Sequence, residues 1–227
     1  MSRLHLLFPV CLTEETNENH KSVKEAFERN ILKYTNEYGM SDESTGHVTM
    51  HHEPEFEPVF KFATQAAKNF VAQYSIDPEV FDYNVVKSWM NILEHKNTPQ
   101  HNHADAHISF AYYINVPEDK AMPITFCNYA DRYEPFSFMA KHNNPSEWNL
   151  INSYGWSFTP EEGKMFVFPA QLQHYVDRIS DAPETGIFSI EDYKKRRVTI
   201  AGDILLTYKE TSAKSLGLQP IKNWRTF

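Results

Sequence analysis

Four side chains that can bind a metal alternate along one short segment. Within residues 100–107, His101, His103, Asp105 and His107 occupy every second position. If this segment is extended, all four point to one face, because the side-chain period of a strand is two residues. Neighbours on that face lie about 6.6 Å apart, so one adjacent pair can converge on an ion while the others diverge. The spacing predicts a metal site to which this segment contributes two ligands.

His174 is the candidate third ligand. It follows the apolar run 164–168 and a short loop, an arrangement typical of a buried strand that leads to a polar site residue. His103, Asp105 and His174 would provide two imidazoles and one carboxylate, the three-ligand face that suits non-heme Fe(II). His101 in place of Asp105 is the alternative, and both sets stay open. No catalytic residue is predicted beyond the metal ligands.

A carboxylate site is predicted on a second β-type run. Arg197 and Thr199 share one face of a strand expected to continue to residue 208. A guanidinium binds a carboxylate through two parallel hydrogen bonds, and a hydroxyl two residues along can add a third. Arg196 competes for this role, because strand register decides which arginine points inward. The position of Thr199 favours Arg197.

The elements that must position these residues follow from periodicity and from chain breakers. Apolar residues recur every three or four positions over residues 20–38 and again from Pro58 to about residue 76, which predicts two amphipathic helices. Short β-rich runs separated by turn residues follow Pro78. They cover residues 84–93, 107–116, 124–129, 155–159, 164–168 and 198–208. Two helices before an antiparallel β region predict an α+β, mainly β fold.

Composition limits the classes of function. A chain of 227 residues is long enough for one sizeable domain. The net charge of −8 argues against a nucleic-acid partner, because phosphate contacts need clustered basic residues. Cys11 and Cys127 form neither a disulfide framework nor a metal pair, which fits a reducing cytoplasm. Since no apolar run approaches about 20 residues, no membrane partner is expected. The sequence does not indicate the oligomeric state.

The ordered set of motifs resembles the 2-oxoglutarate and Fe(II)-dependent oxygenase superfamily. More narrowly, the chain is similar to the prolyl-hydroxylase-like oxygenases of marine phages and bacteria, which begin with a short apolar strand that ends in Phe-Pro, here residues 6–9. The resemblance extends from residue 6 to about residue 208. It is carried by Trp89-Met90-Asn91, His101-Asn102-His103, residues 109–113, residues 166–169, His174 and Arg197-Val198-Thr199.

This resemblance implies a fold and a chemistry. The fold is a double-stranded β-helix (jelly-roll, cupin-like) core with N-terminal helices packed on one sheet, in a single domain over residues 1–227. Its parts would be helices to about residue 80, a β core over 81–210 and a tail over 211–227. The implied cofactors are Fe(II), 2-oxoglutarate and O2. The far carboxylate of 2-oxoglutarate would lie on Arg197, Thr199 and Tyr112 or the adjacent Tyr113.

The implied activity is hydroxylation of a protein, peptide or amino-acid substrate, and two other functions stay open. A cupin-type metal-binding protein without oxygenase activity could use His101, His103 and His174, although it would leave Arg197 without a role. A non-catalytic β-sandwich, such as a virion or interaction module, would leave the histidines in solvent. Substrate identity is not readable, but the long connection 131–154 is a candidate for substrate contacts.

Overall fold

A computed structural model provides the structure of the chain. It describes a set of segments that includes the helices, the strands and all the predicted site residues. These segments are residues 9–37, 49–93, 97–127, 147, 149, 153–178, 180, 189–215, 217 and 219–225. Residues 6–8 of the predicted N-terminal strand (6–9) and nearly all of the predicted substrate-contacting connection lie outside them.

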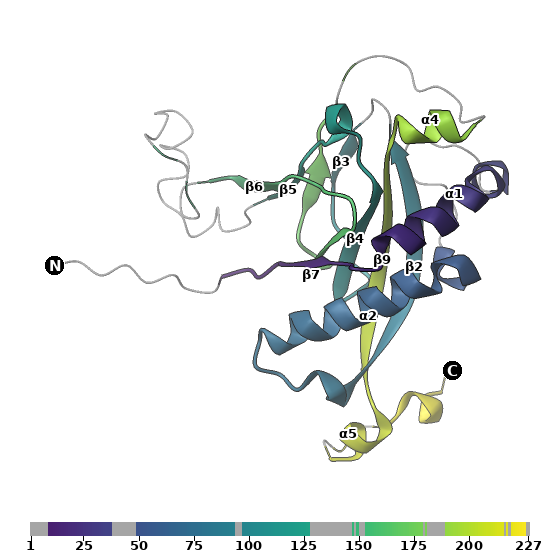
Figure 1. The fold of residues 1–227 in the computed structure, drawn as a ribbon. Helices are drawn as coiled ribbons and strands as arrows, with labels where there is room; N and C mark the ends of the chain where they lie inside the picture. Colours follow the sequence, from purple (N-terminus) through teal and green to yellow (C-terminus); the bar gives the residue numbers. More distant parts are fainter. Residues whose placement is uncertain are drawn as a thin grey trace.

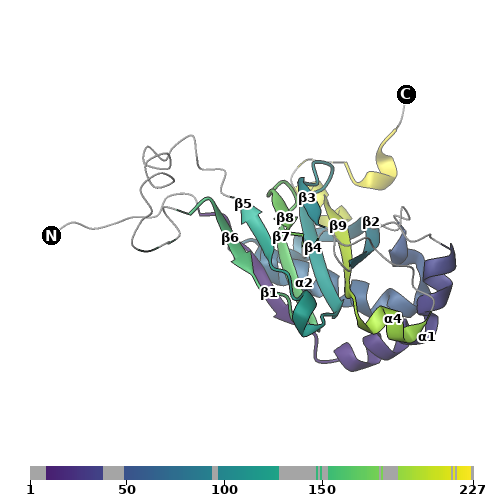
Figure 2. The same cartoon turned by 90° about the horizontal axis from the view of Figure 1, so that it is seen from above.

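Two antiparallel sheets form the core of the molecule (Figure 1). The larger sheet has five strands in the order β1 (Thr13–Thr16), β7 (Lys164–Pro169), β4 (Ile108–Asn115), β9 (Arg197–Tyr208) and β2 (Phe81–Leu93). The smaller sheet has four strands in the order β3 (Thr98–His101), β8 (His174–Val176), β5 (Ile124–Cys127) and β6 (Gly155–Phe158). Figure 2 shows the two sheets facing each other, as in a double-stranded β-helix. The predicted α+β, mainly β fold is confirmed.

Helices cover the outer face of the larger sheet. α1 (His20–Glu37) and α2 (Glu57–Ala72) lie side by side across this face, and the short α4 (Ile190–Lys194) precedes β9 (Figure 1). Phe27 of α1 and Ala63 of α2 are fully buried in one apolar cluster with Tyr112 and Val198 of the sheet. Burial of each large apolar side chain contributes roughly 1.5–3 kcal/mol, so this layer holds the helices on the sheet.

The inner face of the larger sheet is turned toward the smaller sheet. Ala111 and Tyr113 of β4 form a second buried cluster there with Phe168 of β7 and Phe126 of β5. Because side chains alternate along a strand, residues of odd number on β4 and β9 share this interior face. The register places Ser109 opposite Asp203, Ala111 opposite Ala201, and Tyr113 opposite Thr199. The two central strands therefore carry polar residues at both ends of the interior and small residues between them.

Most predicted elements have the expected positions. α1 begins at the predicted residue, and the six predicted strands correspond to β2, β4, β5, β6, β7 and β9 within a few residues. α2 ends at Ala72, before the predicted stop at Pro78, because Ser75 adopts a left-handed conformation with φ of 58°. Three short strands, β1, β3 and β8, were not predicted, since three or four residues are too few to show a period of two.

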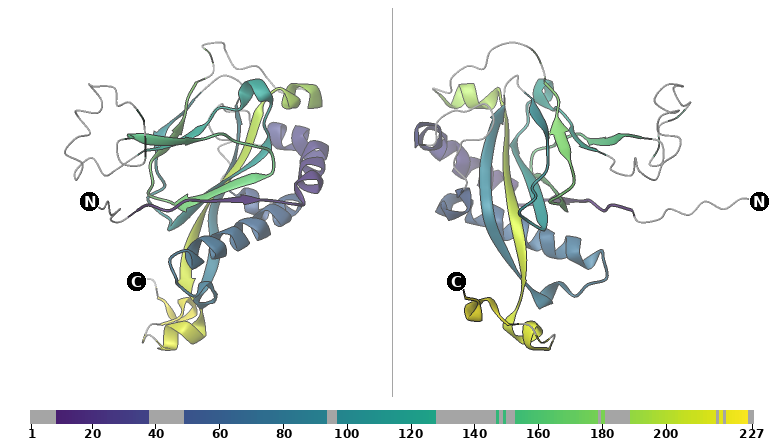
Figure 3. Two further views of the ribbon diagram at one scale, coloured as in Figure 1. Left: turned by 60° about the vertical axis from the view of Figure 1, so that its left-hand side comes forward. Right: turned by 180° about the vertical axis from the view of Figure 1, so that it is seen from behind.

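The C-terminal part leaves the core at the end of β9. α5 (Glu210–Ser215) follows that strand, and both views of Figure 3 show it beyond the edge of the two sheets. Trp224 is 65% exposed there, with its indole nitrogen donating to the carbonyl oxygen of Gln219 at 2.9 Å. Among the described residues, no helix is both long and apolar enough to cross a membrane.

The packing at Gly202 gives a prediction about stability. A Cβ atom at this position of β9 would lie 2.7 Å from Cζ of Phe110 and 3.0 Å from the carbonyl oxygen of Lys87. We expect Gly202→Ala to lower the free energy of unfolding by about 1–3 kcal/mol through overpacking, measured by urea denaturation. Phe110→Leu should cost less in the Gly202→Ala background than in the wild type. Equal costs in both backgrounds would contradict the proposed clash.

Candidate metal and co-substrate site

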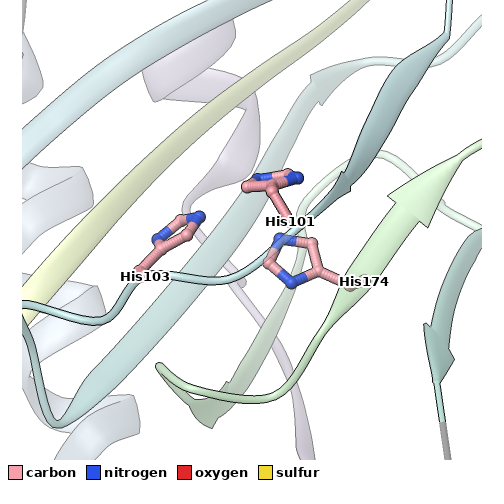
Figure 4. A group of neighbouring side chains, drawn as sticks. All are labelled: His101, His103 and His174. Atoms are coloured by element: carbon pink, nitrogen blue, oxygen red, sulfur yellow. The ribbon is translucent and has the colours of Figure 1, made fainter.

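Three histidines converge between the two sheets. His101 ends β3 and His174 begins β8, and the pairing of these strands makes the two residues direct partners. His103 follows β3 and is held by a 2.8 Å hydrogen bond from its N–H to the carbonyl oxygen of Ala170. The candidate ligand atoms of the three histidines all lie within 4.8 Å of one another, and the rings turn toward a common centre (Figure 4).

Hydrogen bonds at Nδ1 orient all three rings. His101 and His174 each donate from Nδ1 to the backbone carbonyl oxygen two residues earlier, at 2.7 and 3.0 Å. His103 donates from Nδ1 to Oδ1 of Asp203 at 2.5 Å. Because carbonyl and carboxylate oxygens only accept hydrogen bonds, each Nδ1 carries a hydrogen, and in the neutral imidazole the lone pair is then on Nε2. Three imidazole lone pairs are therefore available to one ion.

Burial lowers the pKa of two of these rings. Desolvation lowers the pKa of His174 to about 4, and the neighbouring histidines act in the same direction. The pKa of His101 is also lowered from its ordinary value, again mainly by burial. A histidine that is neutral at pH 7 needs no deprotonation before it binds a metal, so the site is prepared to accept a cation.

The structure brings together the alternative ligand set, with His101 in place of Asp105. Asp105 is exposed in the turn that follows His103. His107 is exposed as well, and its Nδ1 accepts a hydrogen bond from the backbone N–H of Leu206 at 2.9 Å. The common face expected for positions 101, 103, 105 and 107 required an extended chain, but β3 ends at His101 and the chain turns before β4.

Arg197 lies on the interior face, as predicted. Its side chain is 4% exposed, and its guanidinium stacks over the ring of Tyr113 at 5.1 Å. Nη2 donates to the Tyr113 hydroxyl at 3.4 Å, whereas the buried Nε and Nη1 have no hydrogen-bond partner. Unpaired donors on a buried cation are costly, which makes this guanidinium a site for an anion. Thr199 is 5% exposed and pairs with Tyr113 across the strands.

Tyr112 does not take part in this arrangement, contrary to the prediction. It points from the other face of β4 into the layer beneath the helices, where its hydroxyl contacts Nδ1 of His20 at 2.8 Å and Nδ2 of Asn17 at 3.2 Å. Alternation along the strand puts the adjacent Tyr113 inside with Arg197. The tyrosine beside the guanidinium is therefore Tyr113, the second choice from the sequence.

Two polar residues of the site were missed by sequence reasoning. Ser109 and Asp203 are both buried, and the Ser109 hydroxyl donates to Oδ1 of Asp203 at 2.7 Å, beside His103. A signal for Asp203 does exist, because the period of two that joins Arg197 to Thr199 continues to position 203. Ser109 shows no such signal, since a serine in an apolar strand is common.

The donor set fits a cofactor of known type. Within the described residues, the three histidines are the only group of three potential ligands that meets this spacing. A three-ligand face of nitrogen donors leaves positions for further ligands on an octahedral ion such as Fe(II). The unpaired guanidinium of Arg197 fits the distal carboxylate of a dicarboxylate such as 2-oxoglutarate.

Comparisons with known proteins agree with this geometry. Residues 87–187 match a protein family described as "Putative 2OG-Fe(II) oxygenase". No curated protein matches the chain in sequence. The matched segment contains all three histidines, whereas Arg197 lies beyond its end.

Solved structures share the fold at low sequence identity. The non-heme alpha ketoglutarate dependent carbocyclase SnoK from nogalamycin biosynthesis aligns with a TM-score of 0.55 and 10% identity, over 96% of this chain and 90% of that one. A prolyl-4-hydroxylase from Pseudomonas putida aligns with a TM-score of 0.51 and 9% identity, over 86% and 92%.

A third similar structure was determined with its co-substrate. EctD from S. alaskensis, in complex with 2-oxoglutarate and 5-hydroxyectoine, aligns with a TM-score of 0.51 and 12% identity, over 86% of this chain and 72% of that one. These likenesses support the double-stranded β-helix fold. The family match covers somewhat less than half of the chain and marks residues 87–187 as similar to 2-oxoglutarate/Fe(II)-dependent oxygenases.

Proposed function

We propose that this chain is a 2-oxoglutarate/Fe(II)-dependent oxygenase that hydroxylates a protein, peptide or amino-acid substrate, in the manner of prolyl hydroxylases. One observation carries the assignment of its site. Three histidines with free Nε2 lone pairs and one buried guanidinium with unpaired donors belong to the same barrel interior. The three imidazoles could bind a metal ion, and the guanidinium could bind the far end of an anion that also contacts this ion.

His101, His103 and His174 would hold the metal through Nε2. Bound Fe(II), with 2-oxoglutarate and O2, supplies the oxidising power that inserts oxygen into a C–H bond. The protein's part is to orient each imidazole through the three acceptors at Nδ1. Orientation by such second partners is common at metal-binding histidines.

Arg197, Tyr113 and Thr199 would bind the far carboxylate of 2-oxoglutarate. The guanidinium has two nitrogens without a partner, its Nη2 donates to the Tyr113 hydroxyl, and Thr199 shares the interior face. On the interior face between this end and the histidines, β4 and β9 present only Ala111 and Ala201. Small side chains at this level leave room for the carbon chain of the co-substrate between its two ends.

The substrate class rests on the ordered motifs, which are similar to those of prolyl-hydroxylase-like oxygenases. The acidic charge of −8 disfavours a nucleic-acid substrate.

We propose that the chain acts as one domain over residues 1–227. The thiols of Cys11 and Cys127 are unpaired, which is consistent with a reducing compartment such as the cytoplasm.

The metal and co-substrate assignment predicts a spectroscopic signal. Anaerobic addition of Fe(II) and then 2-oxoglutarate to the metal-free protein should produce a visible charge-transfer absorption band. His103→Ala should lose the band because a metal ligand is removed. Arg197→Ala should bind Fe(II) normally but need at least tenfold more 2-oxoglutarate, since it lacks a bidentate contact. The exposed Arg178→Ala serves as the control and should match the wild type.

Other outcomes of this titration favour other functions. If the wild type binds Fe(II) but 2-oxoglutarate produces no band, the chain is better described as a cupin-type metal-binding protein. If the folded wild type binds no metal, the interaction module becomes the better description. The folded state of each variant can be verified by circular dichroism before titration.

A matched pair of tyrosine variants tests which face of β4 contacts the co-substrate. Tyr113→Phe removes a hydroxyl beside Arg197 and should raise the dissociation constant of 2-oxoglutarate by about 5-fold to 15-fold, the equivalent of one hydrogen bond of roughly 1–1.5 kcal/mol. Tyr112→Phe removes an equally buried hydroxyl on the helix side and should change stability but not this constant. Equal effects of both changes on 2-oxoglutarate binding would contradict the assignment.

The buried His174 predicts how stability depends on pH in the metal-free protein. Its pKa is about 4 in the folded state and near 6.5 in the unfolded chain, so between these values only the unfolded chain binds the proton. Stability should therefore fall as pH decreases from 6.5 toward 4, by up to roughly 3 kcal/mol from this residue. His174→Asn should show a shallower decline in chemical denaturation with a chelator present. Parallel pH profiles would exclude this role.

A further inference from the structure

A buried carboxylate lies behind one of the three histidines. Asp203 on β9 is 4% exposed, and its Oδ1 accepts hydrogen bonds from Nδ1 of His103 at 2.5 Å and from the Ser109 hydroxyl at 2.7 Å. The side chain of His103 is itself only 9% exposed. This chain of contacts joins the metal cluster to the two central strands of the larger sheet.

Asp203 differs from the other two acceptors. His101 and His174 donate to neutral backbone carbonyl oxygens two residues earlier, whereas His103 donates to a side chain one hundred residues away. A charge-assisted hydrogen bond is roughly twice as strong as a neutral one and shorter. His103 also lies outside β3, and its backbone hydrogen bond to Ala170 does not fix the orientation of its ring. Asp203 therefore supplies orientation that the local backbone does not.

The position of Asp203 prevents it from acting as a ligand itself. Its Oδ1 is engaged with Nδ1, and the two nitrogens of an imidazole point in diverging directions. The Nε2 atom of His103 is therefore directed away from the carboxylate, and Asp203 is not part of the group whose ligand atoms lie within 4.8 Å. The carboxylate of Asp203 would therefore be separated from the ion by the imidazole of His103.

We propose that Asp203 is a positioning residue that acts through His103 and supplies the negative charge that the three-histidine ligand set lacks. This inference rests on the proposed function, in which His101, His103 and His174 hold Fe(II). Three neutral imidazoles leave the two positive charges of the ion uncompensated within the ligand set. A carboxylate bonded to one of them makes that imidazole a stronger donor and offsets part of the charge. Ser109 holds the carboxylate in place.

Fe(II) affinity tests this proposal without any assay of turnover. The dissociation constant of Fe(II) can be measured anaerobically by competition with a chromophoric chelator. Loss of a carboxylate partner of a metal-bound histidine typically weakens metal binding 10-fold to 100-fold, and we expect this for Asp203→Ala. Asp203→Asn should lie between Asp203→Ala and the wild type, because its amide oxygen still accepts the hydrogen bond but carries no charge.

Ser88→Ala is the matched control. Ser88 is fully buried on β2, and its hydroxyl contacts His51 on the helix side of the sheet, away from the three histidines. This variant should lose stability, seen in its thermal unfolding midpoint, with an unchanged Fe(II) dissociation constant. If Asp203 served only the fold, Asp203→Ala would behave in the same way, and that result would overturn the proposal.

Two further measurements separate the role of Asp203 from a folding defect and from the proposed function. Should Asp203→Ala fail to fold, Asp203→Asn decides alone: an Fe(II) dissociation constant within twofold of the wild type overturns the proposal, and a larger increase supports it. The charge-transfer band of the wild type with Fe(II) and 2-oxoglutarate tests the proposed function separately. A normal band with unaltered Fe(II) affinity in both Asp203 variants would refute only the role of Asp203.

Discussion

The alternation of side chains along β4 and β9 is the constraint on which the rest of the structure depends. The same two strands serve two environments, because every second residue faces the helices and the others face the smaller sheet. Tyr112 and Tyr113 show the consequence most directly. One hydroxyl contacts the side chain of His20 in α1, the other contacts Arg197, and a shift of register by one residue would exchange them. Helix packing therefore fixes which residues can do chemistry.

Burial of a polar side chain inside a barrel destabilises the fold unless the side chain has a hydrogen-bond partner. The two ends of the site differ in how this requirement is met. At the metal end, Asp203 is satisfied within the protein by Ser109 and His103. At the other end, Arg197 keeps two buried nitrogens without partners in the protein. A buried cation with open donors stabilises the fold less than a paired one would. An anionic group of the proposed co-substrate would supply the missing hydrogen-bond acceptors for Arg197.

The parts of the site that the sequence predicts are those that periodicity can reach. The alternation of metal-binding residue types located His101 and His103, the shared face with Thr199 located Arg197, and the apolar run with its following loop located His174. Asp105 failed to join the cluster because parity holds only while the chain is extended, and the turn after His103 is set by tertiary contacts such as the hydrogen bond to Ala170. The short strands β3 and β8, which hold two of the histidines, show no periodic signal of their own.

The same turn explains why a carboxylate is absent from the three converging side chains yet present beside them. After β3 ends at His101, the chain directs His103 inward and Asp105 to solvent. This segment therefore contributes only imidazoles to the three converging side chains. β9 runs along the opposite side of the interior and reaches the same level at position 203. A carboxylate there can touch the outer nitrogen of His103 but not the ion's side of the ring. The topology of two facing sheets thus separates the charge from the ligand set by the width of one imidazole.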